Sequence, residues 1–157
     1  MPQISLNLSE LIRPDRVLEI DTATRDEALR ALCDAAARDP RVLDGQALYE
    51  AVLRREELSS TGIGMGLGIA IPHVKIPQVT DYIIAVGRSR RGVDFKAVDG
   101  QPVHLIFMIC ASDHQAREFV KILAQVTHLL KDESVRNQFM ECEIPDGLLE
   151  TIRRHAR

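Results

Sequence analysis

The sequence predicts a single α/β domain in which helices surround a few strands. Two observations carry this prediction: short apolar segments rich in strand-forming residues, and longer segments whose apolar residues recur at helical spacing. The chain has 157 residues, 45% of them hydrophobic, which is enough to bury about two-thirds of the unfolded surface. No internal repeat and no long linker composition occurs. We therefore expect one domain over residues 1–157.

Two helices are expected before the middle of the chain. Thr24-Arg25-Asp26-Glu27 has the form of a capping box, and the apolar residues that follow it at helical spacing predict a helix over about 25–39. Gly45 opens a second helical stretch, which ends in the charged run Arg54-Arg55-Glu56-Glu57. The segment 59–68 cannot continue this helix because it is rich in glycine.

Two apolar segments predict strands, at Tyr82 to Gly87 and at Val103 to Cys110, with the second deeply buried. Arg91-Gly92 and Asp99-Gly100 have the composition of turns, before and between such segments. The residues between Gln115 and Lys131 place their apolar side chains in one stripe and predict a long amphipathic helix.

Two shorter helices are expected after it, at about 133–141 and 146–155. Ile144-Pro145-Asp146 separates them, and proline suits the start of a helix because the first turn leaves its N–H groups unpaired.

Composition excludes several function classes. The chain has 20 Lys and Arg against 23 Asp and Glu, a formal charge of −3, so no broad basic field is available for nucleic acid. Two Tyr, four Phe and no Trp are too few for a platform on which single-stranded bases stack. We expect a protein that does not bind nucleic acid.

The longest apolar run, Leu105 to Ala111, is far shorter than the roughly 20 residues that span a bilayer. The N-terminus lacks a basic stretch followed by an apolar one. Cys33, Cys110 and Cys142 are widely separated, as expected for reduced thiols packed in a core. We expect a cytoplasmic protein that is not embedded in a membrane.

Glycine concentrates in one segment, Thr61-Gly62-Ile63-Gly64-Met65-Gly66-Leu67-Gly68. Glycine allows close approach to the main chain, so that consecutive N–H groups can point at one anion. Ser60 and Thr61 add hydroxyl donors. The alternative is a tight connection between a helix and a strand. Neither G-x-G-x-x-G nor Gly-Lys-Ser/Thr occurs, which disfavours a nucleotide cradle.

A histidine follows the glycines, at the end of the strand-like segment Gly68-Ile69-Ala70-Ile71-Pro72-His73. Pro72 donates no hydrogen bond, so His73 is expected to leave the sheet at an edge or a strand end. Near neutral pH an imidazole offers a lone pair to an electrophile, while its second nitrogen can bond a backbone carbonyl that fixes the tautomer. Together with the glycines and the arginines, this favours a histidine that accepts a phosphoryl group.

These residues resemble a known family. The segments 55–64 and 68–73, with Ser-Thr-Gly and Ile-Pro-His, are similar to the mannitol/fructose-type enzyme IIA of the bacterial phosphoenolpyruvate-dependent phosphotransferase system, which includes nitrogen-regulatory members. The resemblance extends over about residues 5–153 and includes Gly92-Val93-Asp94-Phe95 and 99–103. It implies an α/β domain with a mixed sheet flanked by helices on both sides.

The resemblance also implies site residues and partners. His73 matches the phosphorylated histidine and Arg55 the active-site arginine. The histidine phosphocarrier protein would supply the phosphoryl group, and an enzyme IIB domain would remove it. Phosphoryl transfer needs in-line positioning and neutralisation of the equatorial oxygens. Arg55 can supply a guanidinium, and the residues expected to bind phosphate are Ser60, Thr61, Gly62, Gly64 and Gly66. No cofactor or metal is expected.

The chain departs from the family at two places. The loop between Thr61-Gly62 and His73 is two residues longer than usual. Phe119 stands where the family has a second histidine, and a phenyl ring cannot donate a hydrogen bond to a phosphoryl oxygen. His114 could reach the site from the loop before the helix, although an exposed loop position is expected. The other histidines are expected in the core (His104) or on the surface (His128 and His155).

Other chemistries fit less well. No H-E-x-x-H or C-x-x-C pair occurs, and Cys110-x-x-x-His114 is a weak metal motif. A serine hydrolase is disfavoured because no G-x-S-x-G elbow occurs. Two main functions stay open: a histidine phosphocarrier in sugar uptake or nitrogen regulation, and a phosphorylation-silent regulatory domain that controls a transporter or kinase by contact. An anion or nucleotide sensor is a third possibility.

Overall fold

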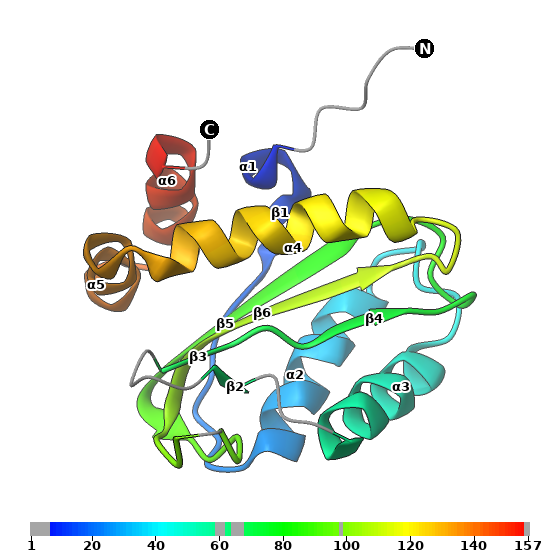
Figure 1. The fold of residues 1–157 in the computed structure, drawn as a ribbon, viewed down its shortest axis with the longest axis horizontal. Coiled ribbons are helices and arrows are strands. Elements are labelled where there is room, and N and C mark those ends of the chain that lie inside the picture. Colours follow the sequence, from blue (N-terminus) through cyan, green and yellow to red (C-terminus); the bar gives the residue numbers. More distant parts are fainter. Residues whose placement is uncertain (1–6, 59–61, 64–67, 98, 156–157) are drawn as a thin grey trace.

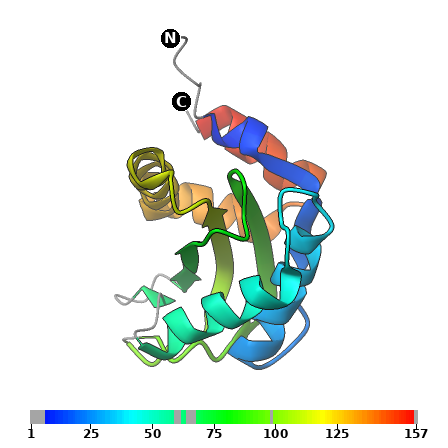
Figure 2. The same ribbon diagram turned by 90° about the vertical axis from the view of Figure 1, so that its right-hand side faces the viewer.

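The computed structural model describes residues 7–58, 62–63, 68–97 and 99–155 of the chain. Within this part, helices cover both faces of one sheet (Figures 1 and 2). One face carries α2 (Arg25–Ala37) and α3 (Gly45–Leu58). The opposite face carries α1 (Leu8–Leu11), α4 (Ala116–Lys131), α5 (Glu133–Glu141) and α6 (Asp146–His155). The expected fold, a mixed sheet with helices on both sides, is confirmed.

The sheet combines parallel and antiparallel pairs. Its strands are β1 (Ile12–Glu19), β2 (Gly62–Ile63), β3 (Ile69–Ala70), β4 (His73–Lys75), β5 (Ile83–Val93) and β6 (Val103–Ala111). Their order is β1-β5-β6-β3-β2, and β4 pairs with β6 further along the edge that β3 occupies. The β1·β5, β3·β6 and β4·β6 pairs are parallel, while β5·β6 and β2·β3 are antiparallel.

The helices form where the sequence predicts them, because the capping residues and the apolar faces indicate the same segments. The Thr24 hydroxyl accepts from the N–H of Glu27 and donates to its carboxylate, which closes the first turn of α2. The Asp132 carboxylate accepts from the N–H groups of Ser134 and Val135 and so begins α5. The apolar stripe of α4 packs on the sheet, while His128 is exposed on its outer face.

Two apolar clusters fill the space on either side of the sheet. One packs β5 and β6 against α4, α5 and α6, and includes Phe107 and Phe139, whose rings are 5.8 Å apart. The other packs the opposite face of the same strands against α2 and α3. Because β5 and β6 are buried on both faces, their sequences contain nearly continuous apolar runs. These runs made both strands predictable.

The prediction of a turn at Arg91-Gly92 is wrong. β5 continues through these residues to Val93, which pairs with Val103 of β6, and the register is irregular between Arg88 and Val93. Gly92 has a φ of +90°, and its N–H donates to the Ser89 hydroxyl. A local irregularity of this kind absorbs a turn-like conformation without ending the pairing of the two strands.

The expectation that His73 leaves the sheet is also wrong in part. The strand does break at Ile71 and Pro72, but the Pro72 carbonyl accepts from the N–H of Ile109, and the chain pairs with β6 again from His73 onward. Proline costs the sheet a donor and not an acceptor, so pairing resumes one residue later. His73 is therefore the first residue of a strand. This agrees with the part of the expectation that placed His73 at a strand end.

β1 was not predicted, because Arg13, Pro14, Asp15 and Arg16 interrupt its apolar pattern. Arg16 is nevertheless buried: its guanidinium donates to the Ile84 carbonyl and pairs with Asp39. Arg41 donates to the same carboxylate and to the Tyr82 carbonyl. These hydrogen bonds attach the segment after α2 to the sheet. The Arg41 guanidinium, with Arg16 adding to its effect, holds the pKa of Asp39 well below its usual range.

We expect Asp39→Asn to lower the free energy of unfolding by about 1 to 2 kcal/mol at pH 7. The Asp39 pKa is depressed in the folded state, so its stabilisation is present above about pH 4 and is lost as the pH falls below that value. Urea unfolding at pH 7 and at pH 3 checks this, because the gap between wild type and variant should narrow in acid. Asp34→Asn, which removes an exposed pair with Arg30, is the matched control; an equal loss there would contradict the prediction.

In the described part of the chain, no helix has the length and apolar content that crossing a membrane requires. Cys33 and Cys110 are buried and Cys142 is partly exposed, and all three are free thiols. Burial raises the pKa of the Cys33 thiol to about 12, so this sulfur stays protonated at neutral pH.

Candidate active site

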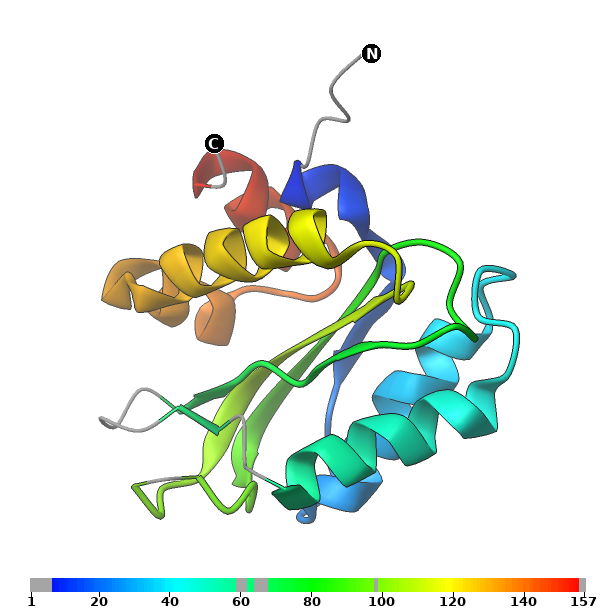
Figure 3. The ribbon, with the colours of Figure 1, turned by 45° about the vertical axis from the view of Figure 1, so that its right-hand side comes forward.

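β4 lies at an edge of the sheet, between α3 and α4. Figure 3 shows the two helices on either side of this strand. β4 pairs with β6 along one side, and no strand of the described residues pairs with its other side. His73 begins β4 and pairs with Ile109. The strand thus presents His73 at an open edge between two helices, where a second molecule can approach it.

The backbone fixes the His73 imidazole. Its Nδ1 lies 2.6 Å from the carbonyl oxygen of Ile71, two residues earlier. A carbonyl only accepts, so Nδ1 carries the proton and donates it in this bond. Nε2 then has the free lone pair. The contact spans the interruption between β3 and β4, in which Ile71 and Pro72 lie.

A cavity of about 500 Å³ opens beside His73. Three elements line it: α3 contributes one wall, β4 the floor and the first half of α4 the other wall. The charged and titratable residues of the lining are Arg54, Arg55, His73 and Lys75. No acidic side chain occurs among the described lining residues. The cavity therefore combines one nucleophilic nitrogen with cationic groups, a chemistry suited to a phosphoryl group.

Phe119 closes the cavity from the side of α4. Its ring centroid lies 5.7 Å from that of His73, and the two planes are tilted by 49°. The Lys75 ammonium lies 5.3 Å from the same phenyl centroid. Phe119 is buried, so the phenyl ring supports the imidazole without competing for its lone pair.

The structure brings some of the predicted site residues together. Arg55 is half-buried and lines the cavity with His73, while its neighbour Arg54 is exposed and also lines it. Gly62 begins β2 and pairs with Ala70. The other four residues expected to bind phosphate, Ser60, Thr61, Gly64 and Gly66, lie outside the described residues.

The remaining histidines lie elsewhere. His114 is in the loop before α4, with its side chain 92% exposed and Asp113 3.5 Å away, and it is not among the lining residues. The expected exposed position of His114 is confirmed. His104 is half-buried and donates from Nδ1 to the Ser89 carbonyl, so it is satisfied as expected. Its ring lies beside Gly68 and Gly92, outside this cavity.

Sequence reasoning missed several lining residues, and the most informative of them are Lys75, Leu58 and Val120. Lys75 follows His73 by two positions, and alternation along a strand would have placed both side chains on one face. That signal was hidden because the strand was expected to end at His73. Leu58 and Val120 are 79% and 63% exposed, and they form an apolar rim on the two helical walls. Exposed large apolar side chains around a cavity are typical of a surface that binds another protein.

Comparison with known proteins decides the family. Residues 10–155 match the profile described as "Phosphoenolpyruvate-dependent sugar phosphotransferase system, EIIA 2". The chain belongs to this EIIA 2 family. The resemblance inferred from the Ser-Thr-Gly and Ile-Pro-His residues is thereby confirmed.

Relatives in the EIIA 2 family carry two kinds of name. The chain is 36% identical over 139 residues to the fructose-specific EIIA component of Haloferax volcanii, covering 86% of this chain and 89% of that protein. It is 33% identical to a nitrogen regulatory protein of Bradyrhizobium diazoefficiens, covering 82% of each. It is also 36% identical to the fructose-specific EIIABC component of Bacillus subtilis, but spans only 24% of that longer protein.

Solved EIIA structures share the fold. The nitrogen regulatory protein IIA-Ntr of Neisseria meningitidis superposes with a TM-score of 0.85 at 24% identity, covering 92% of this chain and 98% of that one. A complex of enzyme IIA mannitol with phosphorylated enzyme IIB mannitol from Escherichia coli gives 0.77 at 21% identity, with the same coverage.

Proposed function

We propose that the protein is a histidine phosphocarrier in which Nε2 of His73 accepts a phosphoryl group from the histidine phosphocarrier protein. The observation that carries this proposal is the Nδ1 contact with the Ile71 carbonyl, which leaves Nε2 as the free nucleophile beside a cationic cavity. Membership of the EIIA 2 family supports it.

The proposed step is an in-line displacement. The Nε2 lone pair forms a bond to phosphorus while the bond between phosphorus and the donor's imidazole nitrogen breaks, and the electron pair stays on the donor. The Nδ1 proton remains in its bond to Ile71 throughout. Arg55 neutralises charge on the equatorial oxygens, and the exposed Leu58 and Val120 contact the partner's surface.

The phosphoryl group then has two possible fates. It passes to an enzyme IIB domain, a fate favoured by the Escherichia coli complex, in which an enzyme IIA is bound to a phosphorylated enzyme IIB. Alternatively it serves as a regulatory signal, which the nitrogen regulatory relative favours. A second candidate function is a phosphorylation-silent domain that controls a transporter or kinase by contact. Phe119 beside His73 favours this candidate, because a phenyl ring gives the phosphoryl group no hydrogen bond.

The test is intact-mass spectrometry after incubation with phosphoenolpyruvate, enzyme I and the histidine phosphocarrier protein of the same organism. We expect a gain of one phosphoryl mass that is lost in mild acid, as a phosphohistidine requires. Adding the organism's enzyme IIB domain should remove the label if the protein is a transport component. Retention of the label supports the regulatory fate, and no label with a functional donor supports the phosphorylation-silent domain.

A further inference from the structure

Lys75 shares the exposed edge of β4 with His73. The two residues are separated by one position, so their side chains leave the strand on the same face, with Cα atoms about 6.6 Å apart in an extended strand. Val74 between them is buried in the cluster formed with α2 and α3, and it also contributes to the cavity lining. Both His73 and Lys75 line the cavity. A lysine side chain is long enough to reach an imidazole at this spacing.

Within the described part of the chain, the Lys75 ammonium contacts an aromatic ring and forms no ion pair. It lies 5.3 Å from the centroid of Phe119, and a cation–π contact at an exposed site is weak. Among the described residues, no carboxylate forms an ion pair with Lys75, and none of those that line the cavity is acidic. A cation held this weakly can move to a stronger anionic partner at little cost.

Phe119 contacts both this cation and the nucleophile. The centroid of its phenyl ring lies 5.7 Å from that of the His73 imidazole and 5.3 Å from the ammonium. A phosphoryl group on Nε2 would bring negatively charged oxygens to this side of the cavity, where Phe119 has no donor to offer. Lys75 is a donor whose ammonium lies beside Phe119, and its side chain leaves β4 on the same face as that of His73.

We propose that Lys75 is a catalytic residue that binds an equatorial oxygen of the phosphoryl group on His73, opposite Arg55. The proposal rests on phosphorylation of His73. During transfer the ammonium leaves the phenyl ring and donates to the phosphoryl oxygen, while Phe119 keeps the imidazole in place. No proton changes hands in this movement, because Lys75 acts as a charged hydrogen-bond donor.

Phosphoramidate tests this step without any protein partner. The Nε2 lone pair attacks its phosphorus, the P–N bond breaks and ammonia leaves, so the labelling rate reports the pocket alone. We expect Lys75→Met to lower the second-order labelling rate of His73 by about a hundredfold, the lower end of the effect of removing a preorganised transition-state donor. Lys75→Arg, which retains the positive charge, should stay within about threefold of wild type. An equal rate in Lys75→Met and wild type would overturn the proposal.

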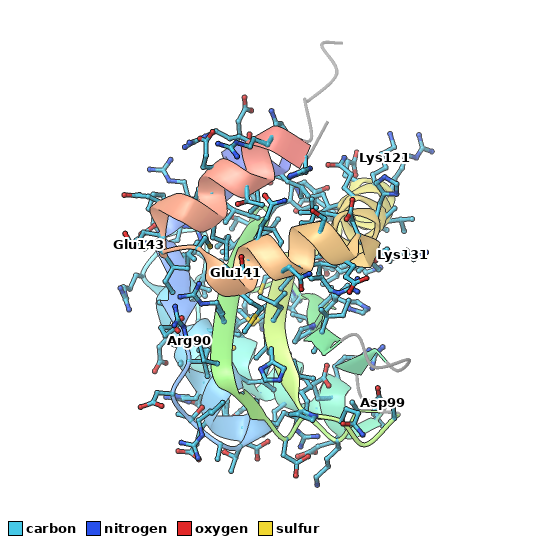
Figure 4. The ribbon with its side chains drawn as sticks, turned by 90° about the vertical axis from the view of Figure 1, so that its left-hand side faces the viewer. Arg90, Asp99, Lys121, Lys131, Glu141 and Glu143 are labelled. Atoms are coloured by element: carbon cyan, nitrogen blue, oxygen red, sulfur yellow. The ribbon has the colours of Figure 1, made fainter. Side chains whose placement is uncertain are left out.

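Lys121→Met is the matched control. It makes the same substitution on α4, where Figure 4 shows Lys121 on the side away from the sheet, and it is exposed and absent from the cavity lining. We expect its rate to match wild type; an equal fall in both methionine variants would show a general effect of net charge and overturn the assignment to Lys75.

Phe119→His provides a second, independent test of the role of Lys75. A histidine there would place an N–H donor beside the His73 ring. If Lys75 supplies the missing donor, Lys75→Met should cost at least threefold less in the Phe119→His background than in wild type. Additive effects would count against the proposal. These experiments also separate the role of Lys75 from the proposed function. If phosphoramidate labels His73 but the protein donor does not, the phosphocarrier function is rejected and the role of Lys75 is still tested. If neither reagent labels His73, both proposals are rejected.

Discussion

His73→Ala is expected to abolish phosphorylation completely while leaving the fold intact. The substitution removes the only nitrogen that the cavity offers with a free lone pair among the described residues. The side chain lies at an open sheet edge and is only half-buried, so its loss leaves little empty volume. Intact mass after the phosphotransfer reaction, with circular dichroism of the unlabelled protein, measures both results.

His128→Ala is the matched control for this variant. His128 is exposed on the outer face of α4 and is not among the residues that line the His73 cavity. It should be labelled like wild type. A label that persists in His73→Ala would contradict the proposed site and direct attention to His104 or His114, which peptide mapping in mildly alkaline solution would distinguish.

Arg88→Met is expected to destabilise the protein by about 3 kcal/mol, because it leaves buried carbonyl groups without donors. The Arg88 side chain is 4% exposed and extends from β5 to the end of α5, where it donates to the carbonyls of Phe139 and Cys142. It also pairs with Glu19 of β1 at 2.9 Å. One side chain thus connects two strands with the segment between α5 and α6. Urea unfolding at neutral pH measures the loss.

Arg90→Met provides the comparison. Arg90 lies two residues further along the same strand and pairs with the same Glu19, but its side chain is 66% exposed (Figure 4). An exposed pair contributes less than about 1 kcal/mol. Similar losses in the two variants would mean that the Glu19 pair, and not the buried carbonyls, accounts for the stability that Arg88 contributes.

The fold was predictable where the residues of one segment alone specify its structure. The capping box at Thr24 and the apolar stripe of α4 specify helices without reference to the rest of the chain. β1 could not be predicted, because its buried Arg16 looks like a surface residue until the Ile84 carbonyl and Asp39 are placed beside it. A buried charge of this kind depends on partners far away in the sequence.

The sequence predicted the chemistry of the site but only some of the residues that form it. His73 follows from its residue type and its position after Pro72, and Arg55 follows from the family resemblance; the structure places both at one cavity. Lys75 and the apolar rim depend on whether pairing with β6 resumes after Pro72, which is a property of the assembled sheet. The phosphate-binding role expected of Ser60, Thr61, Gly64 and Gly66 stays a prediction.

The partner of the His73 Nδ1 is a main-chain carbonyl, that of Ile71. Where a carboxylate side chain orients a catalytic imidazole, one nucleotide change in the gene can remove the orienting group. Here no replacement of the Ile71 side chain removes it, because every residue type has the same carbonyl. The proton position on the imidazole is therefore insensitive to point mutation at the residue that sets it. Only a change in the course of the chain, for which Pro72 is the most direct target, can release the ring.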